Sequence, residues 1–291
     1  MRWFGRRLFG ASKKLDFNEI VIFASPRSGT NFFCECLGAL PEVAGYYELF
    51  NPQGVFGLGG RILPIICEQL GLTDVADAKD PRLVKIFRNT PLDALDALAT
   101  VSRAQDRSVM SYKIFPRQLS LETIGTILDN DQRHALFLVR RRLDVYISLQ
   151  KARQSGSWTR NSTVDVLPEI EIDDFLEWSA RTDEWYADTF KVARARSRKI
   201  IVASYDADVD VPKKELIEKL NRALSTFDIE TTLGPSLKSV RFKRQDRRGQ
   251  PFEKIANGEA LRASLQQAGK LKYALGSPLE KEQAEFPFIR D

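Results

Sequence analysis

Histidine and cysteine are scarce in this chain: its 291 residues include one histidine, His134, and three cysteines, Cys34, Cys36 and Cys67. A single histidine excludes most histidine-based metal sites and leaves a Ser-His-Asp triad only that one residue to use. Three cysteines are too few for a disulfide framework, and Cys34-x-Cys36 lacks the spacing of a zinc knuckle. We therefore expect a metal-free protein in a reducing, cytoplasmic setting.

Long hydrophobic runs are also absent. No stretch approaches the roughly 20 apolar residues that span a bilayer. The first ten residues are basic but carry neither the apolar region nor the cleavage site of a signal peptide. Hydrophobic residues make up 43% of the chain and charged residues 29%. This composition is close to the globular average, so it predicts a well-buried core and excludes a disordered chain.

Positive charge is present in small excess, with 44 Lys and Arg against 39 Asp and Glu, a formal net charge of +5. It gathers in three segments, residues 1–14, 138–153 and 239–254, and the remainder is net acidic. Such clusters indicate anionic partners at particular places. Residues 1–18 form a basic arm, which we interpret as packing on the domain or a partner. The alternative is peripheral contact of the arm with the inner face of a membrane.

From Glu19 onward, apolar runs of strand length alternate with amphipathic stretches of helix length. The predicted strands are 20–24, 83–87, 109–115, 135–139 and 200–204. The predicted helices are 31–40, 62–70, 92–103, 121–129, 144–153, 173–195, 213–224 and a region near 258–269. Short apolar runs rich in Val, Ile and Phe suit strands that are buried on both faces. The alternation predicts an α/β fold, a three-layer α/β/α sandwich with a central, mostly parallel sheet, as one domain over residues 19–291.

The segment 25–31, Ser-Pro-Arg-Ser-Gly-Thr-Asn, follows the first predicted strand. A helix that opens on Thr30 would aim its free amides at one spot, which suits phosphate or sulfate. Gly29 would let the backbone approach the anion, Ser28 and Thr30 would add hydroxyl donors, and Arg27 would reach over it. The Walker A pattern Gly-x4-Gly-Lys-Ser/Thr is absent. The alternative is an ordinary strand-to-helix turn with an exposed arginine.

A second group of cations follows the strand predicted at 135–139, where Arg140, Arg141 and Arg142 are consecutive. Open α/β sheets bind ligands at the carboxyl ends of their strands. Ser148 lies two turns into the next helix and could face back toward this end, so Arg140 and Ser148 together would hold a second phosphate. The alternative is that the arginines are solvated surface residues.

The pair of patterns Ser25-x-Arg27-Ser28-Gly29-Thr30 and Arg140-x7-Ser148 resembles the two cofactor signatures of sulfotransferases that use 3'-phosphoadenosine 5'-phosphosulfate. The resemblance spans roughly residues 19–270 and is strongest to the bacterial carbohydrate branch, which includes trehalose and nodulation-factor sulfotransferases. It implies a P-loop nucleotide-kinase-like sulfotransferase fold. It also implies transfer of a sulfuryl group, without metal, to a hydroxyl of a carbohydrate or glycolipid, with adenosine 3',5'-bisphosphate as product. A homodimer would fit the same branch.

Carried over to this chain, the resemblance assigns Arg27 and the amides of Ser28 to Asn31 to the transferred group and its phosphate. Arg140 and Ser148 are assigned to the 3'-phosphate. Lys113 lies at the end of a predicted strand and would touch sulfate or substrate, unless it is a surface lysine.

The general base is harder to assign, because Phe115 stands where cytosolic relatives carry a histidine. The trehalose-type branch implies Glu48 instead. Its neighbours Tyr46, Tyr47, Leu49 and Phe50 predict an apolar setting that would raise the affinity of Glu48 for a proton. The alternative is a loop glutamate in a surface ion pair. His134, which comes just before a predicted strand, is interpreted as structural.

Two further elements complete the predicted site. Trp158 matches a position that lines the acceptor pocket, where its ring would stack on a sugar, or else it packs under a loop. Lys243 and Arg244 lie in a basic segment that resembles the loop closing over the adenosine bisphosphate, or else that loop is solvated. Two other functions stay open at this point. They are a P-loop-like kinase that uses ATP with magnesium, and a basic nucleic-acid-binding protein, for which no helix-turn-helix or aromatic RNA motif is evident.

Overall fold

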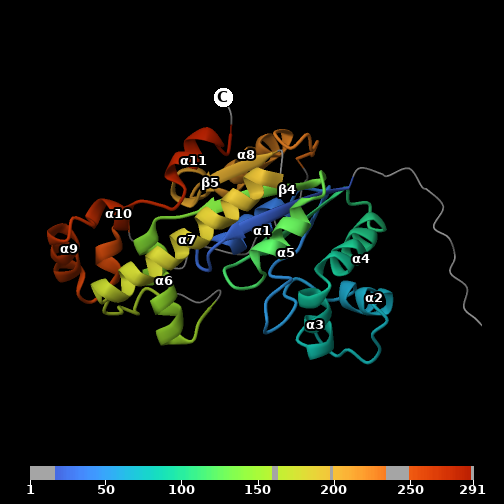
Figure 1. Cartoon of the computed structure of the whole chain (residues 1–291), viewed down its shortest axis with the longest axis horizontal. Coiled ribbons are helices and arrows are strands. Elements are labelled where there is room, and N and C mark those ends of the chain that lie inside the picture. The colour runs from blue at the N-terminus through green and yellow to red at the C-terminus, as the bar shows by residue number, and fades with distance from the viewer. Residues whose placement is uncertain (1–16, 159–162, 197–198, 234–248, 290–291) are drawn as a thin grey trace, which may run out of the picture.

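A five-stranded parallel sheet forms the centre of the molecule (Figure 1). The computed structural model describes residues 17–158, 163–196, 199–233 and 249–289. The strands are β1 (Asn18–Ala24), β2 (Val43–Gly45), β3 (Val109–Ile114), β4 (Arg133–Val139) and β5 (Ile200–Ser204). Their order is β2-β3-β1-β4-β5, and all four neighbouring pairs are parallel. The predicted α/β/α sandwich is confirmed, and the described part of its sheet is parallel throughout.

Helices connect the strands and cover both faces of the sheet. Those before β4 are α1 (Thr30–Leu37), α2 (Ile62–Gln69), α3 (Pro81–Asn89), α4 (Pro91–Arg103) and α5 (Leu121–Leu128). Those after β4 are α6 (Arg142–Ser155), α7 (Ile172–Arg196), the π-helix η1 (Tyr205–Val209), α8 (Lys213–Ser225), the 3₁₀-helix η3 (Pro251–Lys254), α9 (Gly258–Gln267), α10 (Leu271–Leu275) and α11 (Glu280–Glu285). In Figure 1, α9 and α10 lie at the opposite end of the molecule from α2 and α3. No helix in the described ranges combines the length and the apolar character needed to cross a membrane.

The alternation of side chains along β1 divides the core in two. Val21 and Phe23 pack with α4, α5 and α7 on one face, whereas Ile20 and Ile22 pack with α1 and α8 on the other. Both sets are fully buried, as expected for a strand at the centre of a parallel sheet. The connection that follows β1 therefore runs over one face through α1, and the connection that follows β4 runs over the other through α7. This reversal makes the gap between β1 and β4 the topological switch point, where open α/β sheets bind ligands.

The strand predicted at 83–87 is wrong, because these residues belong to helix α3. Asp80 caps this helix by accepting a hydrogen bond from the Arg82 amide at 2.8 Å, and Pro81 occupies its first turn. Leu83 and Phe87 are both fully buried and lie four residues apart, which is the spacing of one helix face. Four apolar residues interrupted by Lys85 fit a short strand or one face of a helix, and here the capping residues decide for the helix.

The remaining differences concern short elements and the ends of the chain. β2, α10 and α11 were not predicted, since three to six residues give too little periodicity to detect. The last two residues of the predicted arm, residues 1–18, belong to the domain. Phe17 is buried under the guanidinium of Arg103, and β1 begins at Asn18. Residues 1–16 lie outside the described part of the chain, so the role of the arm stays a prediction.

His134 lies inside β4 at the amino end of the sheet, far along the strand from the ligand edge. Its ring stacks on Phe227 with centroids 4.8 Å apart, and its Nε2 lies 3.0 Å from the Asn18 side-chain oxygen. Burial, with a contribution from the charge of Lys199, lowers the pKa of His134 from 6.5 to about 4, while Asp228 acts in the opposite direction. This setting is that of a neutral, structural histidine.

Acidification is therefore expected to destabilise the fold through His134. The unfolded chain takes up the proton first, so the stabilisation is complete above pH 6.5 and is lost as the pH falls from 6.5 toward 4. The loss between pH 7.5 and 4.5 amounts to about 2 kcal/mol for this group. Urea unfolding gives the free energy of unfolding of the wild type and of His134→Gln at both pH values. The contribution of His134 is the difference between the two proteins in how much this free energy falls from pH 7.5 to 4.5. Identical pH dependences would contradict the prediction.

Candidate anion-binding site at the carboxyl edge of the sheet

The loop after β1 holds itself together through its own serines. The Ser28 hydroxyl donates to the Ser25 carbonyl oxygen at 2.8 Å, and the two hydroxyl oxygens lie 2.8 Å apart. Ser28 is fully buried and its hydroxyl is bonded within the turn, whereas the sequence predicts it as a donor to the anion. Arg27 and Gly29 both adopt left-handed backbone conformations, with φ of 73° and 84°. Helix α1 begins directly after Gly29 without a side-chain cap, which leaves its first amides to face an anion.

Arg27 links this loop to the segment that follows β4. Its Nε donates to the Ser148 hydroxyl at 3.0 Å, and its NH1 donates to the carbonyl oxygen of Trp158. Arg140 in turn donates from its NH1 to the Arg27 carbonyl oxygen at 3.1 Å. Burial and the nearby charge of Arg140 lower the pKa of Arg27 to about 10. Two positive side chains are thus held close together at the switch point between β1 and β4.

Arg140 is positioned by an aromatic ring at the end of β5. Its guanidinium carbon lies 4.3 Å from the centroid of the Tyr205 ring. Its Nε is buried without a hydrogen-bond partner. A buried N–H without a partner costs about 1–3 kcal/mol, and an anionic acceptor would remove that cost. The arrangement therefore fits a phosphate or sulfate group.

Lys113 connects the helix end to the carboxylate of Glu48. It is 1% exposed, and its Nζ donates to the Thr30 hydroxyl at 3.1 Å and to the Asn31 side-chain oxygen at 2.6 Å. The same nitrogen lies 3.6 Å from Glu48 Oε1. Lys113 is therefore a buried cation next to the first turn of α1 and not a surface lysine.

Glu48 has a polar setting, which corrects the apolar one expected from its neighbours in sequence. Its Oε2 accepts hydrogen bonds from the side-chain amides of Asn51 at 2.7 Å and Gln118 at 3.2 Å. The apolar neighbours pack into the core instead: Tyr46, Leu49 and Phe50. The Glu48 side chain is 21% exposed, so it is open to solvent on one side, and on the other it is held by two hydrogen-bond donors and the ion pair with Lys113. Gln118 lies 70 residues from Glu48 and has no local pattern that would predict this contact.

Most of the predicted site residues take part in these contacts, which form two groups. The first group is Arg27, Arg140, Ser148 and Trp158. The second group is Thr30, Asn31, Glu48 and Lys113. Ser148 bonds Arg27, although it was expected to act together with Arg140. Trp158 contributes its carbonyl oxygen, and its side chain is 51% exposed, so it does not pack under a loop. Lys243 and Arg244 lie outside the described residues.

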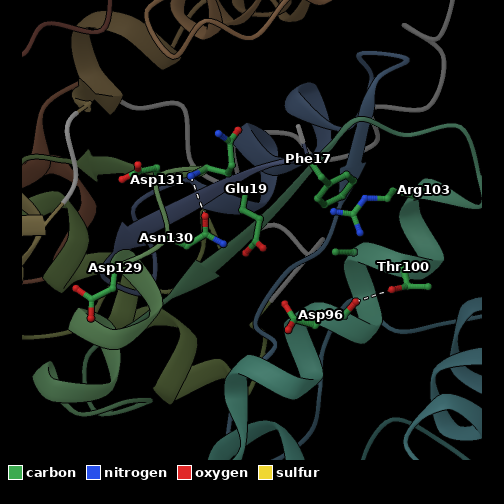
Figure 2. Close-up of a pocket in the computed structure, with 10 residues that line it drawn as sticks. Phe17, Glu19, Asp96, Thr100, Arg103, Asp129, Asn130 and Asp131 are labelled. Carbon is green, nitrogen blue, oxygen red and sulfur yellow. Dashed lines mark hydrogen bonds between the residues drawn. The ribbon is translucent and has the colours of Figure 1, made fainter. Parts of the chain in front are cut away.

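A separate cavity of about 460 Å³ lies at the amino end of the sheet (Figure 2). Its lining includes the carboxylates of Glu19, Asp96, Asp129 and Asp131, with Arg103 stacked over Phe17. Within it, Glu19 pairs with Arg133 at 2.8 Å and accepts a hydrogen bond from Tyr112 at 3.1 Å. An acidic lining repels phosphate and sulfate, so this cavity is not a candidate for the anion.

Comparison with known proteins adds little. No family model matches the chain, and no curated protein matches it. A solved structure described as "Sulfotransferase Domain from the Curacin Biosynthetic Pathway" aligns with 92% of this chain and 97% of its own, at 13% identity and a TM-score of 0.39. This likeness is too distant to assign the site.

Gly29 provides a test of how closely Tyr205 approaches the loop. A Cβ at Gly29 would lie 2.1 Å from Tyr205 Cε2, whereas a Cβ at Gly156, which also has a positive φ, would have no neighbour within 4 Å. Both alanine substitutions strain the backbone by about 1 kcal/mol, but only Gly29→Ala also displaces a ring. We expect Gly29→Ala to lower the free energy of unfolding by about 1–3 kcal/mol more than Gly156→Ala, measured by urea unfolding. Equal losses would show that the ring moves away without cost.

Proposed function

We propose that this protein is a sulfotransferase that moves a sulfuryl group from 3'-phosphoadenosine 5'-phosphosulfate to a hydroxyl of a carbohydrate or glycolipid. The observation that carries the proposal is the buried Nε of Arg140, which has no partner and lies beside Arg27 at the switch point. The two arginines belong to the two segments whose patterns resemble the nucleotide signatures of sulfotransferases. A ligand with two anionic groups would engage both segments at once.

The nucleotide supplies the sulfur that the acceptor oxygen attacks. As the new sulfur–oxygen bond forms, the bond from the sulfur to the bridging oxygen of the 5'-phosphate breaks, and the phosphate leaves. The residues of the chain have to hold the nucleotide and offset the charge on the leaving phosphate. Arg27 and the amides at the start of α1 face the 5' side, and Arg140 faces the 3'-phosphate. Lys113, fixed by Thr30 and Asn31, places an ammonium beside the first turn of α1. It would stabilise negative charge on the group that departs.

Glu48 is the proposed base that accepts the proton of the acceptor hydroxyl. Asn51 and Gln118 both donate to its Oε2, and Lys113 lies 3.6 Å from its Oε1, so both oxygens are positioned. A carboxylate held in position loses less entropy when it reaches the geometry needed for proton transfer. Lys113 contacts both α1 and Glu48, so it holds the base close to the anion-binding loop.

Titration calorimetry with adenosine 3',5'-bisphosphate tests the proposal. Binding of this nucleotide, with weaker binding of ATP and magnesium, is the expected outcome. Preference for ATP with magnesium would favour the kinase alternative. If neither adenosine 3',5'-bisphosphate nor ATP with magnesium binds, the proposed function is overturned.

Arg140→Ala is expected to weaken binding of adenosine 3',5'-bisphosphate by about tenfold or more, because a charged contact to the 3'-phosphate is worth about 1.5–3 kcal/mol. Binding of adenosine 5'-phosphate should change far less. Arg153→Ala, an exposed residue of the same basic segment, removes the same charge and serves as control. Equal losses for both nucleotides would show that Arg140 does not contact the 3'-phosphate.

Glu48→Gln is expected to leave nucleotide binding intact and to reduce turnover by about 10²-fold or more, since the amide cannot take up the proton. Turnover is measured as transfer of labelled sulfate from the nucleotide into lipid and polysaccharide extracts of the native organism. Glu122→Gln, an exposed glutamate of α5, is the matched control. Full activity of Glu48→Gln would remove Glu48 as the base.

A further inference from the structure

Tyr186 joins the two strand ends that carry the anion-binding loops. It lies on α7, the long helix that crosses one face of the sheet, and it is 1% exposed. The Ser25 backbone N–H donates to the Tyr186 hydroxyl oxygen at 2.7 Å, and this hydroxyl donates to the Leu138 carbonyl oxygen at 2.9 Å. One side chain thus connects the first residue after β1 with the penultimate residue of β4.

The hydroxyl stands where the ladder between β1 and β4 stops. Ala24 and Leu138 are the last residues paired between these strands. Beyond them, the Ser25 N–H and the Leu138 carbonyl oxygen are both bonded to the tyrosine and not to each other. A direct ladder bond would bring that nitrogen and oxygen to about 3 Å. The hydroxyl therefore takes the place of the direct bond and ties the two strand ends to one side chain, while satisfying both buried groups.

This insertion lies at the base of the site. Two residues after Ser25 the chain reaches Arg27, and two residues after Leu138 it reaches Arg140. We propose that Tyr186 is a positioning residue that sets the separation of the two anion-binding loops and so selects ligands whose two anionic groups are spaced to match. The identity of such a ligand as adenosine 3',5'-bisphosphate rests on the proposed function. Burial raises the pKa of Tyr186 to about 12, so its hydroxyl keeps the proton it donates to Leu138.

Tyr186→Phe tests this role because the ring that fills the core is retained. Tyr112→Phe is the matched control, since Tyr112 is also fully buried and its hydroxyl donates to Glu19 at the opposite end of the sheet. We expect Tyr186→Phe to lower the affinity for adenosine 3',5'-bisphosphate about tenfold and the affinity for adenosine 5'-phosphate about twofold or less. Tyr112→Phe should leave the ratio of the two affinities unchanged. Titration calorimetry of all three proteins measures both ligands.

An unchanged affinity ratio in Tyr186→Phe, or the same change in both variants, would overturn the proposal, because a hydroxyl that merely stabilises the fold does not alter selectivity. A wild type that binds neither nucleotide would overturn the proposed function but not decide the role of Tyr186. Crystal structures of the wild type and Tyr186→Phe decide it in that case. Direct pairing of the Ser25 amide with the Leu138 carbonyl oxygen is the expected result. Strand ends that keep their separation without the hydroxyl would contradict it.

Discussion

Two positive side chains held close together at the switch point are the constraint on which the site depends. Arg27 adopts a left-handed backbone and has a pKa lowered to about 10, partly by the charge of Arg140. Arg140 carries a buried Nε with no partner. Each of these features costs folding free energy, and strained or unsatisfied groups persist where the surrounding structure holds them in place. Here the Tyr205 ring, the Arg27 carbonyl and the Ser148 hydroxyl supply that support, and a bound anion would relieve both the repulsion and the missing hydrogen bond.

The sequence predicted the parts of the molecule that have a local signal. Four of the five strands and most helices follow from apolar runs and periodicity, and the loop after β1 follows from a strand, a glycine and a helix start. The strand predicted at 83–87 was wrong because its four apolar residues around Lys85 fit either structure, and the cap at Asp80 favours the helix. Tyr186 and Gln118 have no local signal at all. Their partners lie 161 and 70 residues away in sequence, so only the folded chain shows what they contact.

The two ends of the sheet carry opposite electrostatic characters, and this separation follows from how charge is placed along the strands. At the amino end, Glu19 and Arg133 face each other in a buried pair across β1 and β4, with acidic residues around them. At the carboxyl end the cations Arg27, Arg140 and Lys113 gather instead. Because parallel strands bring all their carboxyl ends to one edge, cations placed after successive strands add their potentials there. A net charge of +5 for the whole chain does not reveal this asymmetry.

The anion loop and the proposed acceptor side are mechanically coupled by two side chains that each bond in both directions. Lys113 holds Thr30 and Asn31 on one side and faces Glu48 on the other. Arg27 bonds the carbonyl oxygen of Trp158, so the backbone that presents this half-exposed ring is tied to the residue that would grip the nucleotide. The exposed indole of Trp158 adds a flat apolar surface beside the cations at this edge of the sheet. Displacement of Arg27 would break its contact with the Trp158 carbonyl oxygen, whereas Lys113 links the first turn of α1 to Glu48 by separate contacts.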